Sequence, residues 1–223
     1  MVANRGDADP GFVGERLEAL GYALERFERE APAEWPGLEG VDLVLTLGSD
    51  WSVYWDHVAE WVDAESALVM GAHRRGTPVF GICFGGQLLA RAHGGVVSRA
   101  AVAEIGWVGV ESAEGALAGD GPWFQWHADC FLAPPAASLL ARNSAAEQAF
   151  CLGRSLGVQF HPEVNARIVE RWAAGGAEEL ARHGVDPEAL IARTRAEVGR
   201  SQAAAFRLVD WFCEYVAGSA GRP

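Results

Sequence analysis

Residues 78–87 read PVFGICFGGQ, and this stretch decides the fold. Its first five residues form an apolar run that predicts a buried strand, and GGQLLARAH at residues 85–93 predicts a helix directly after it. Residues 42–48, DLVLTLG, are apolar on both faces, as in a strand of a helix-covered parallel sheet. Apolar residues at helical spacing connect the two strands, from Val58 to about Gly76. This alternation predicts an α/β fold with a largely parallel central sheet and helices on both faces.

The remaining sequence extends this core on both sides. Residues 10–22 predict a helix and residues 23–27 a short strand, while only residues 2–4 are available for a first strand. Either that first strand is very short or the true start lies upstream. Short β segments follow between about residues 95 and 160, namely GGVVS, GWVGV, WFQW, SLLA, QAFCL and SLGVQF.

After Pro162 the chain is expected to be helical to its end. The last helix, over residues 201–216, carries an apolar stripe that we expect to pack on the core, made of Ala205, Leu208, Phe212 and Tyr215. No repeat or linker separates domains. We therefore expect a single domain over residues 1–223, with its core motifs in 43–164 and a helical C-terminal extension over 165–223.

Composition excludes several classes of protein. The 223 residues are 50% hydrophobic and 22% charged, a balance typical of globular proteins. All 18 basic residues are arginine, and the net charge of −12 disfavours nucleic acid and anionic membranes as partners. No apolar run approaches a membrane span, and the N-terminus lacks the apolar core of a signal peptide, so a cytoplasmic location is expected.

The four cysteines predict neither a zinc site nor a dithiol motif. They are Cys83, Cys130, Cys151 and Cys213, and no two of them form a CxxC pair. In a cytoplasmic chain all four are expected to be reduced, and the last three, in apolar β or helical segments, are interpreted as inert core thiols. No metal or cofactor motif is present, so none is expected.

Cys83 lies in a predicted turn between a strand and a helix, a position typical of catalytic nucleophiles. A strand enters this position, a helix leaves it, and the small residues Gly81 and Gly85 flank it, which is the spacing of a nucleophile elbow. At a helix N-terminus the macrodipole favours the thiolate, and the backbone N–H of Phe84 would point to the space where an oxyanion forms. The alternative is a buried cysteine in a tight turn.

A matching base follows at the end of a later predicted strand, in QFHPE at residues 159–163. A cysteine nucleophile needs a base, and the base needs a third group that orients it. On an extended backbone His161 and Glu163 point the same way, and Pro162 stiffens the link. A lone histidine here would more often be structural, but beside the elbow the catalytic interpretation is favoured.

Together, GICFGGQ and QFHPE resemble the motifs of the class I, triad-type glutamine amidotransferases, whose fold is flavodoxin-like. The resemblance runs from about Leu43 to Val164, and EIGW at 104–107 with FQWHAD at 124–129 is similar to the free-standing subgroup related to the glutaminase domain of GMP synthase. It implies Cys83 as nucleophile, His161 as base and Glu163 as orienter. The implied reaction is thiolate attack on the side-chain amide of glutamine, release of ammonia and hydrolysis of a γ-glutamyl thioester.

The resemblance also implies an oxyanion hole. Gly48 and Ser49 occupy the place of the family's oxyanion loop, so the backbone N–H of Ser49 would be the second donor beside Phe84. Serine replaces a glycine of the family there, and Asp50 adds a negative charge nearby.

Further substrate contacts are implied for Gln87 and for the strand segment His127, Ala128 and Asp129, which would bind the amino-acid end of the substrate. Ala128 replaces the family's usual glycine. Gln87 is alternatively an exposed residue of the first helical turn, and His127 with Asp129 a structural hydrogen-bonded pair. Glu104 is interpreted as structural.

Three functions remain open from the sequence. The chain is a glutaminase that supplies ammonia to a separate synthase subunit, a self-sufficient γ-glutamyl hydrolase or peptidase, or a binding protein that lost its chemistry. The complete triad disfavours the third. The aromatic residues Trp51, Tyr54 and Trp55 form either a cover of the site, a docking patch, or the packed start of the next helix.

Overall fold

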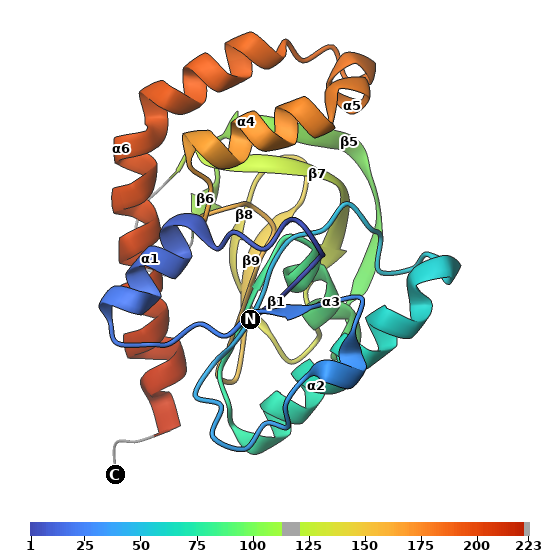
Figure 1. Ribbon diagram of the computed structural model, residues 1–223, viewed down its shortest axis with the longest axis vertical. Coiled ribbons are helices and arrows are strands. Elements are labelled where there is room, and N and C mark those ends of the chain that lie inside the picture. The colour runs from blue at the N-terminus through green and yellow to red at the C-terminus, as the bar shows by residue number, and fades with distance from the viewer. Residues whose placement is uncertain (113–120, 221–223) are drawn as a thin grey trace.

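The computed structural model describes residues 1–112 and 121–220. An 8-stranded sheet forms its centre, in the order β2-β1-β3-β4-β10-β9-β8-β6, and β5 pairs with β7 in a separate 2-stranded sheet (Figure 1). The strands are β1 (Val2–Ala3), β2 (Phe27–Glu28), β3 (Val44–Thr46), β4 (Val79–Ile82), β5 (Val96–Val108), β6 (Glu111–Ser112), β7 (Trp123–Leu132), β8 (Ser138–Arg142), β9 (Glu147–Leu152) and β10 (Ser155–Val158).

The central sheet has a parallel half and an antiparallel half. The neighbours from β2 through β10 run parallel, and β10-β9, β9-β8 and β8-β6 run antiparallel. The short strands β3, β4 and β10 are buried along their whole length, and Thr46 and Ser155 are their only polar residues. The predicted α/β fold with a mostly parallel sheet is therefore confirmed.

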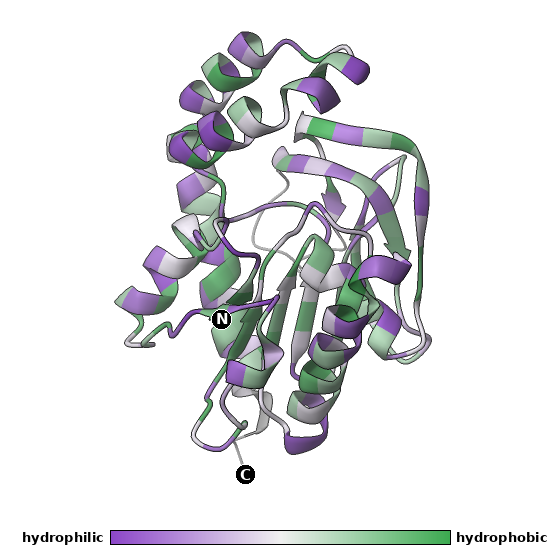
Figure 2. Cartoon of the chain, turned by 45° about the vertical axis from the view of Figure 1, so that its right-hand side comes forward, coloured by the Kyte–Doolittle hydropathy of each residue, from purple (hydrophilic) through white to green (hydrophobic). Residues whose placement is uncertain are grey.

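Helices cover both faces of the sheet. On one face, α1 (Gly11–Ala19) and α6 (Pro187–Trp211) bury Leu17 and Leu208 in one core cluster with Phe80. On the other, α2 (Ala59–Arg75) and α3 (Phe84–Ala92) share a second cluster with Val79. Figure 2 shows the hydrophobic residues gathered on the central strands between these helices. Successive residues of a strand point to opposite faces, so β3 and β4 contribute to both clusters, with Leu45 and Phe80 in the first and Val44 and Val79 in the second.

Two further helices, α4 (Ala166–Gly175) and α5 (Ala177–Arg182), lie beside β5 and β7 (Figure 1). They form a third core cluster in which Ile168 and Leu180 pack with Trp107 and Phe124. The side chain of Asn165 caps α4 by accepting a hydrogen bond from the Ile168 backbone N–H. This third cluster attaches the last part of the chain to the sheet edge at which the candidate site lies.

Several predicted boundaries were wrong. GGVVS and GWVGV are not two short strands but the two ends of β5, whose pairing with β7 is shifted in register between Arg99 and Glu104. The strand expected at 23–27 overlaps β2 only at Phe27, because β2 begins there and ends at Glu28. The last helix begins at Pro187, where Asp186 caps it, far before the expected start at residue 201, and it continues into a π-helical turn, Phe212–Val216.

The apolar stripe of this last helix is buried except at its end. Ala205, Leu208 and Phe212 are buried, but Tyr215 is 59% exposed, so its assignment to the core was wrong. The π-helical turn explains the difference, because a wider turn rotates the residues after it out of the helical repeat. Residues 221–223 of the expected C-terminal extension lie outside the described residues. No helix in the described parts of the chain is both long and apolar enough to cross a bilayer.

Candidate active site

The predicted site residues follow the carboxyl ends of three adjacent parallel strands, β3, β4 and β10. Gly48 comes two residues after β3, Cys83 directly after β4, and His161 three residues after β10. Carboxyl ends of parallel strands meet at one edge of a sheet, which is where open α/β folds bind ligands. The topology thus brings together segments that are far apart in the sequence.

Cys83 occupies a strained turn between β4 and α3. Its φ of 51° and ψ of −106° make it the only non-glycine residue with positive φ among residues 1–112 and 121–220. The turn needs glycine on each side: a Cβ on Gly81 would lie 2.5 Å from the Gly85 carbonyl oxygen, and one on Gly85 would lie 2.3 Å from that of Thr46. Strain of this kind persists only where the surroundings enforce it, and it is concentrated at functional sites.

His161 and Glu163 form a short, buried pair. Nδ1 of His161 lies 2.7 Å from Oε1 of Glu163, and both side chains are less than 5% exposed. The Glu163 carbonyl accepts a hydrogen bond of 3.0 Å from the backbone N–H of Phe12, and the His161 N–H donates to the Phe124 carbonyl at 2.8 Å. These backbone bonds hold the pair between α1 and β7. With Nδ1–H donated to the carboxylate, Nε2 is available to exchange a proton with a neighbour.

The surroundings favour a protonated His161. Burial by itself lowers the pKa of His161, but the carboxylate of Glu163 and the sulfur of Cys83 raise it, and the net pKa lies well above 6.5. Nε2 of His161 has no hydrogen-bond partner among the residues that the structure describes. The arrangement fits an imidazolium that stabilises a cysteine thiolate and can deliver a proton to a leaving group.

Gln159 is a site residue that the sequence analysis missed. Its Nε2 lies 3.7 Å from the sulfur of Cys83, and its Oε1 accepts a hydrogen bond of 3.3 Å from Nε2 of Gln87. The register explains this contact: Val158 pairs with Ile82, so Gln159 and Cys83 leave adjacent strands side by side. Because this pairing is not visible in either segment alone, only the knowledge that β10 and β4 are neighbours would have identified Gln159.

Gln87 is buried rather than exposed. It is 3% exposed, and its Nε2 also donates to the Asp129 backbone carbonyl at 3.1 Å. The alternative of an exposed first-turn residue is therefore wrong. The side chain links the nucleophile's helix to the strand β7, on which a substrate contact was predicted.

The predicted oxyanion loop lies against Cys83 and His161. A Cβ on Gly48 would lie 2.9 Å from Cε1 of His161 and 3.7 Å from Cβ of Cys83, so no side chain fits between the loop and the two catalytic candidates. Oγ of Ser49 accepts a hydrogen bond of 3.1 Å from the Trp51 N–H, which tightens the turn after it. Asp50, whose charge we expected to disturb an oxyanion, is exposed to solvent, where its charge is screened.

The segment from His127 to Asp129 divides into two sets of contacts. Nδ1 of His127 lies 2.9 Å from the Asp129 backbone carbonyl, and Nε2 lies 3.1 Å from Oε1 of Gln125 and 3.3 Å from Oε2 of Glu104. The side chain of His127 thus belongs to a buried polar cluster, and it does not pair with the Asp129 side chain. The Asp129 carboxylate instead accepts hydrogen bonds from Ser52 and, at 2.8 Å, from the Tyr54 hydroxyl. Ala128 lies between the two sets on β7.

The aromatic residues after the oxyanion loop have different surroundings. Trp51 stacks on Trp61 of α2, with ring centroids 5.1 Å apart, and its edge contacts Phe84. Tyr54 reaches β7 through Asp129, whereas Trp55 is 37% exposed and stacks on His57. Trp51 therefore agrees with a packed helix start, and Tyr54 fastens the loop to the strand beside the site.

A second aromatic pair, formed by Trp126 and Trp172, lies beside the imidazole of His161. The ring of Trp172, on α4, contacts the imidazole edge-on with a centroid distance of 4.9 Å, and Trp126 contacts Trp172 in turn. Each indole N–H is bonded, that of Trp172 to Asp7 and that of Trp126 to Glu179. No motif in the sequence indicated Trp172, because its contact with His161 depends on how α4 packs.

The other thiols have raised pKa values. Burial raises the pKa of the Cys151 thiol to about 12, and it also raises the pKa of Cys130 and of Cys213. The raised pKa values favour the protonated thiol at neutral pH, which disfavours these three cysteines as nucleophiles. Within the described residues, no group of three or more His, Cys, Asp or Glu side chains is arranged to hold a metal ion.

Comparison with known proteins also indicates a glutamine amidotransferase. The family described as "Glutamine amidotransferase class-I" matches residues 55–170, which is more than half of the chain. GMP synthase [glutamine-hydrolyzing] of Aeropyrum pernix is 34% identical over 204 residues, covering 85% of this chain and 36% of the relative. The corresponding enzyme of Thermus thermophilus is 41% identical over 97 residues, covering 40% of this chain and 19% of the relative. The chain thus matches about a third or less of the length of these relatives.

Solved structures are similar over nearly the whole chain. A glutamine amidotransferase from Thermotoga maritima has a TM-score of 0.85 and 27% identity, covering 96% of each chain. One from Methylobacillus flagellatus has a TM-score of 0.86 and 25% identity, covering 96% of this chain and 92% of the other. With the family match over residues 55–170, these similarities show that the chain belongs to the class I glutamine amidotransferase family.

Proposed function

We propose that this chain hydrolyses the side-chain amide of glutamine through a γ-glutamyl thioester on Cys83 and releases ammonia for a separate synthase subunit. The observation that carries the proposal is the joint geometry of the strained Cys83 and the short His161–Glu163 pair at one sheet edge. Neither feature alone requires catalysis. Together they supply a nucleophile, a proton carrier and its orienting carboxylate.

In the first half-reaction, the Cys83 thiolate attacks the amide carbon of the substrate. The S–C bond forms, and the carbonyl electrons move to the oxygen, which accepts hydrogen bonds from the backbone N–H groups of Ser49 and Phe84. When the tetrahedral intermediate collapses, the C–N bond breaks. His161 donates its Nε2 proton to the leaving nitrogen, so that ammonia departs and a thioester remains.

In the second half-reaction, neutral His161 removes a proton from water. The hydroxide attacks the thioester carbon, the C–S bond breaks, and glutamate leaves while the Cys83 thiolate and the His161 imidazolium are restored. Glu163 keeps its hydrogen bond to Nδ1 in both steps, and thereby holds Nε2 toward the reacting atoms. Gln159 donates a hydrogen bond to the sulfur, which favours the thiolate as leaving group.

The experiment is release of ammonia and glutamate by the purified chain, with glutamine and a panel of γ-glutamyl amides and dipeptides as substrates. We expect Cys83→Ala to abolish turnover with an unchanged circular dichroism spectrum. The matched control is Cys151→Ala, which removes a thiol that burial keeps protonated and should retain turnover. Turnover that survives in Cys83→Ala, or that Cys151→Ala alone abolishes, would contradict the proposal.

A self-sufficient γ-glutamyl hydrolase is the second candidate. The observation in its favour is the match over 96% and 92% of the two solved amidotransferase chains, which means that chains of this length occur in the family. Rapid partner-free cleavage of a γ-glutamyl amide other than glutamine would support the hydrolase. Slow glutamine turnover that Cys83→Ala abolishes would support an ammonia-supplying subunit.

A further inference from the structure

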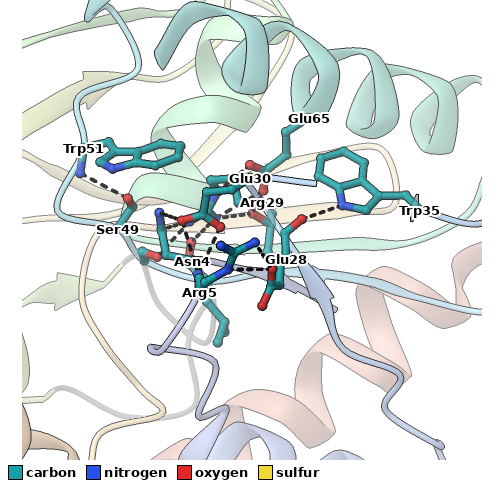
Figure 3. Close-up of polar contacts among 12 residues, drawn as sticks. Asn4, Arg5, Glu28, Arg29, Glu30, Trp35, Ser49, Trp51 and Glu65 are labelled. Carbon is teal, nitrogen blue, oxygen red and sulfur yellow. Dashed lines mark hydrogen bonds and ion pairs between the residues drawn. The ribbon is translucent and has the colours of Figure 1, made fainter. Parts of the chain in front are cut away.

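A fully buried arginine lies directly beneath the oxyanion loop. Arg29 follows β2, is 0% exposed, and its Nε lies 2.6 Å from Oε2 of Glu65 on α2 (Figure 3). Its Nη2 donates to the Leu47 carbonyl at 2.9 Å and its Nη1 to the Gly48 carbonyl at 3.2 Å. Asn4 also accepts from the guanidinium. Arg29 is therefore bonded to the two peptide units that lead into the loop.

The same guanidinium contacts the second proposed oxyanion donor. Its Cζ lies 4.5 Å from the centroid of the Phe84 ring, a cation–π distance, and Phe84 is 0% exposed. Phe84 is the first residue of α3, directly after the nucleophile. One side chain thus contacts Phe84 and the carbonyl oxygen of the Gly48–Ser49 peptide, whose N–H is the other proposed oxyanion donor.

The bond to the Gly48 carbonyl fixes the direction of the Ser49 N–H. The described residues contain no cis peptide bond, and in a planar trans peptide the carbonyl oxygen and the following N–H point in opposite directions. Because Arg29 holds the Gly48 oxygen toward the protein interior, the Ser49 N–H of the same peptide points away from Arg29. A rotation of this peptide would break the bond to Arg29 and misdirect the donor.

We propose that Arg29, oriented by Glu65, is a positioning residue that preorganises the two oxyanion donors, Ser49 and Phe84. This inference rests on the proposed function, because it assumes that an oxyanion forms at Cys83. Preorganised donors stabilise the developing charge without reorganisation during the reaction, and they contribute strongly to acyl transfer.

Arginine suits this position for a reason that lysine does not share. The guanidinium has five N–H donors in a rigid plane, and here they bond two backbone carbonyls, Asn4 and Glu65 together. A lysine ammonium in the same place keeps the positive charge opposite Glu65, but its three donors cannot span all these acceptors. Arg29→Lys therefore separates the charge from the geometry.

The test compares Arg29→Met/Glu65→Gln, in which both buried charges are removed together, with Arg29→Lys and the wild type. The matched control is Arg16→Met/Asp210→Asn, which removes the bidentate pair between α1 and α6 far from the loop. Three readouts are needed: kcat and KM for hydrolysis of γ-glutamyl amides, the rate of Cys83 alkylation by iodoacetamide, and the NMR order parameter of the Ser49 amide. Alkylation displaces iodide at a tetrahedral carbon and forms no oxyanion, so it reports the thiolate alone.

We expect kcat of the double variant to fall by about ten- to a hundredfold, since misplacing a donor by about 1 Å costs about a hundredfold. KM and the alkylation rate should stay close to those of the wild type. The order parameter of Ser49 should fall below the value of about 0.85 typical of rigid backbone. Arg29→Lys should show the same pattern with a smaller loss, and the control variant should show none of it.

The outcomes separate this proposal from the proposed function. A wild type that cleaves no γ-glutamyl amide, with a Ser49 amide that still loses order in the variants, would overturn the function but support the positioning role. An active wild type whose variants keep kcat and an ordered Ser49 would overturn the positioning role. Equal losses of hydrolysis and alkylation would also overturn it, because they indicate a general structural defect. If the double variant does not fold, Arg29→Lys carries the same test.

Discussion

The described parts of the chain contain two buried histidine–glutamate pairs, and the pairs differ in which of their atoms remain without a hydrogen-bond partner. His161 and Glu163 are 2.7 Å apart, whereas Nε2 of His127 and Oε2 of Glu104 are 3.3 Å apart. In the second pair both ring nitrogens of His127 face oxygen atoms, and Glu104 also accepts hydrogen bonds from Asn143 at 2.7 Å and from Gln148 at 3.0 Å. That cluster joins β5, β7 and β9 and leaves His127 no free position.

The pair of His161 and Glu163, by contrast, has polar atoms that form no hydrogen bond. Nε2 of His161 and Oε2 of Glu163 have no hydrogen-bond partner within the described residues, although both are buried. A buried polar atom without a partner destabilises the fold, and the proposed mechanism needs Nε2 of His161 free to transfer a proton. The comparison teaches that burial and a nearby carboxylate do not mark a catalytic histidine. We predict that a ring nitrogen left unbonded beside Cys83 marks it instead.

The sharpest way to test this comparison is to remove each histidine in turn. We expect His161→Ala to lower kcat by about 10²- to 10⁴-fold, because it removes the group that carries the proton. His127→Gln should instead lower the free energy of unfolding by about 1–3 kcal/mol and change kcat far less. Steady-state kinetics and urea unfolding of both variants check this. A loss of kcat in His127→Gln as large as that in His161→Ala would show that the polar cluster takes part in the reaction.

A milder change keeps both histidines and neutralises their partners. Glu163→Gln should also reduce kcat, but its kcat should remain about ten- to a hundredfold higher than that of His161→Ala, because an orienting group is partly replaceable. Burial lowers the pKa of His161, but the charges of Glu163 and Cys83 raise it further, to well above 6.5. Without the Glu163 charge the pKa of His161 falls, so the imidazolium loses its proton at lower pH.

The alkaline limb of kcat/KM should therefore move to lower pH in Glu163→Gln. The measurement is a pH profile of kcat/KM for the wild type, Glu163→Gln and the matched variant Glu104→Gln. The Glu104→Gln limb should coincide with that of the wild type, since Glu104 contacts only the other histidine of the comparison. A limb that stays in place in Glu163→Gln would mean that Glu163 does not control the protonation of His161.

The sequence was sufficient for those features that are encoded in contiguous residues. The turn at Cys83 is specified by its own glycines, and only Pro162 separates His161 from Glu163, so each half of the site is visible as a local motif. Helix α2 and strand β4 were predicted closely because their apolar periodicity is continuous. The role of each predicted site residue remains a prediction.

Features that depend on contacts between distant segments were not predictable. Gln159 reaches Cys83 through the pairing of β10 with β4, and Trp172 reaches His161 through the packing of α4. Arg29 lies in a charged stretch, RFERE at residues 26–30, that is typical of a solvated surface, yet it is fully buried. In each case the partner is more than 15 residues away or on another element, so no local pattern indicated the contact.

The smallest expected effect concerns the pH dependence of stability. Burial tends to raise the pKa of Glu104, but hydrogen bonds from His127, Asn143 and Gln148 and the charge of His127 outweigh it, so the pKa lies below 4.5. A carboxyl whose pKa is lower in the folded than in the unfolded chain stabilises the fold above its unfolded pKa, and this contribution is lost as the pH falls through the folded pKa.

Glu104→Gln removes this contribution while preserving the shape of the side chain. We expect the variant to be less stable than the wild type by about 1–3 kcal/mol at neutral pH, with glutaminase activity nearly unchanged. The difference should be constant above the unfolded pKa of 4.5 and shrink as the pH falls from there through the lower folded pKa, below which the carboxyl is protonated in both states. Urea unfolding from pH 7 to pH 3 measures both free energies. A difference that does not change with pH would mean that Glu104 stabilises the cluster by accepting hydrogen bonds rather than through its ionisation, and the two histidine–glutamate pairs would then differ in chemistry as well as in their unbonded atoms.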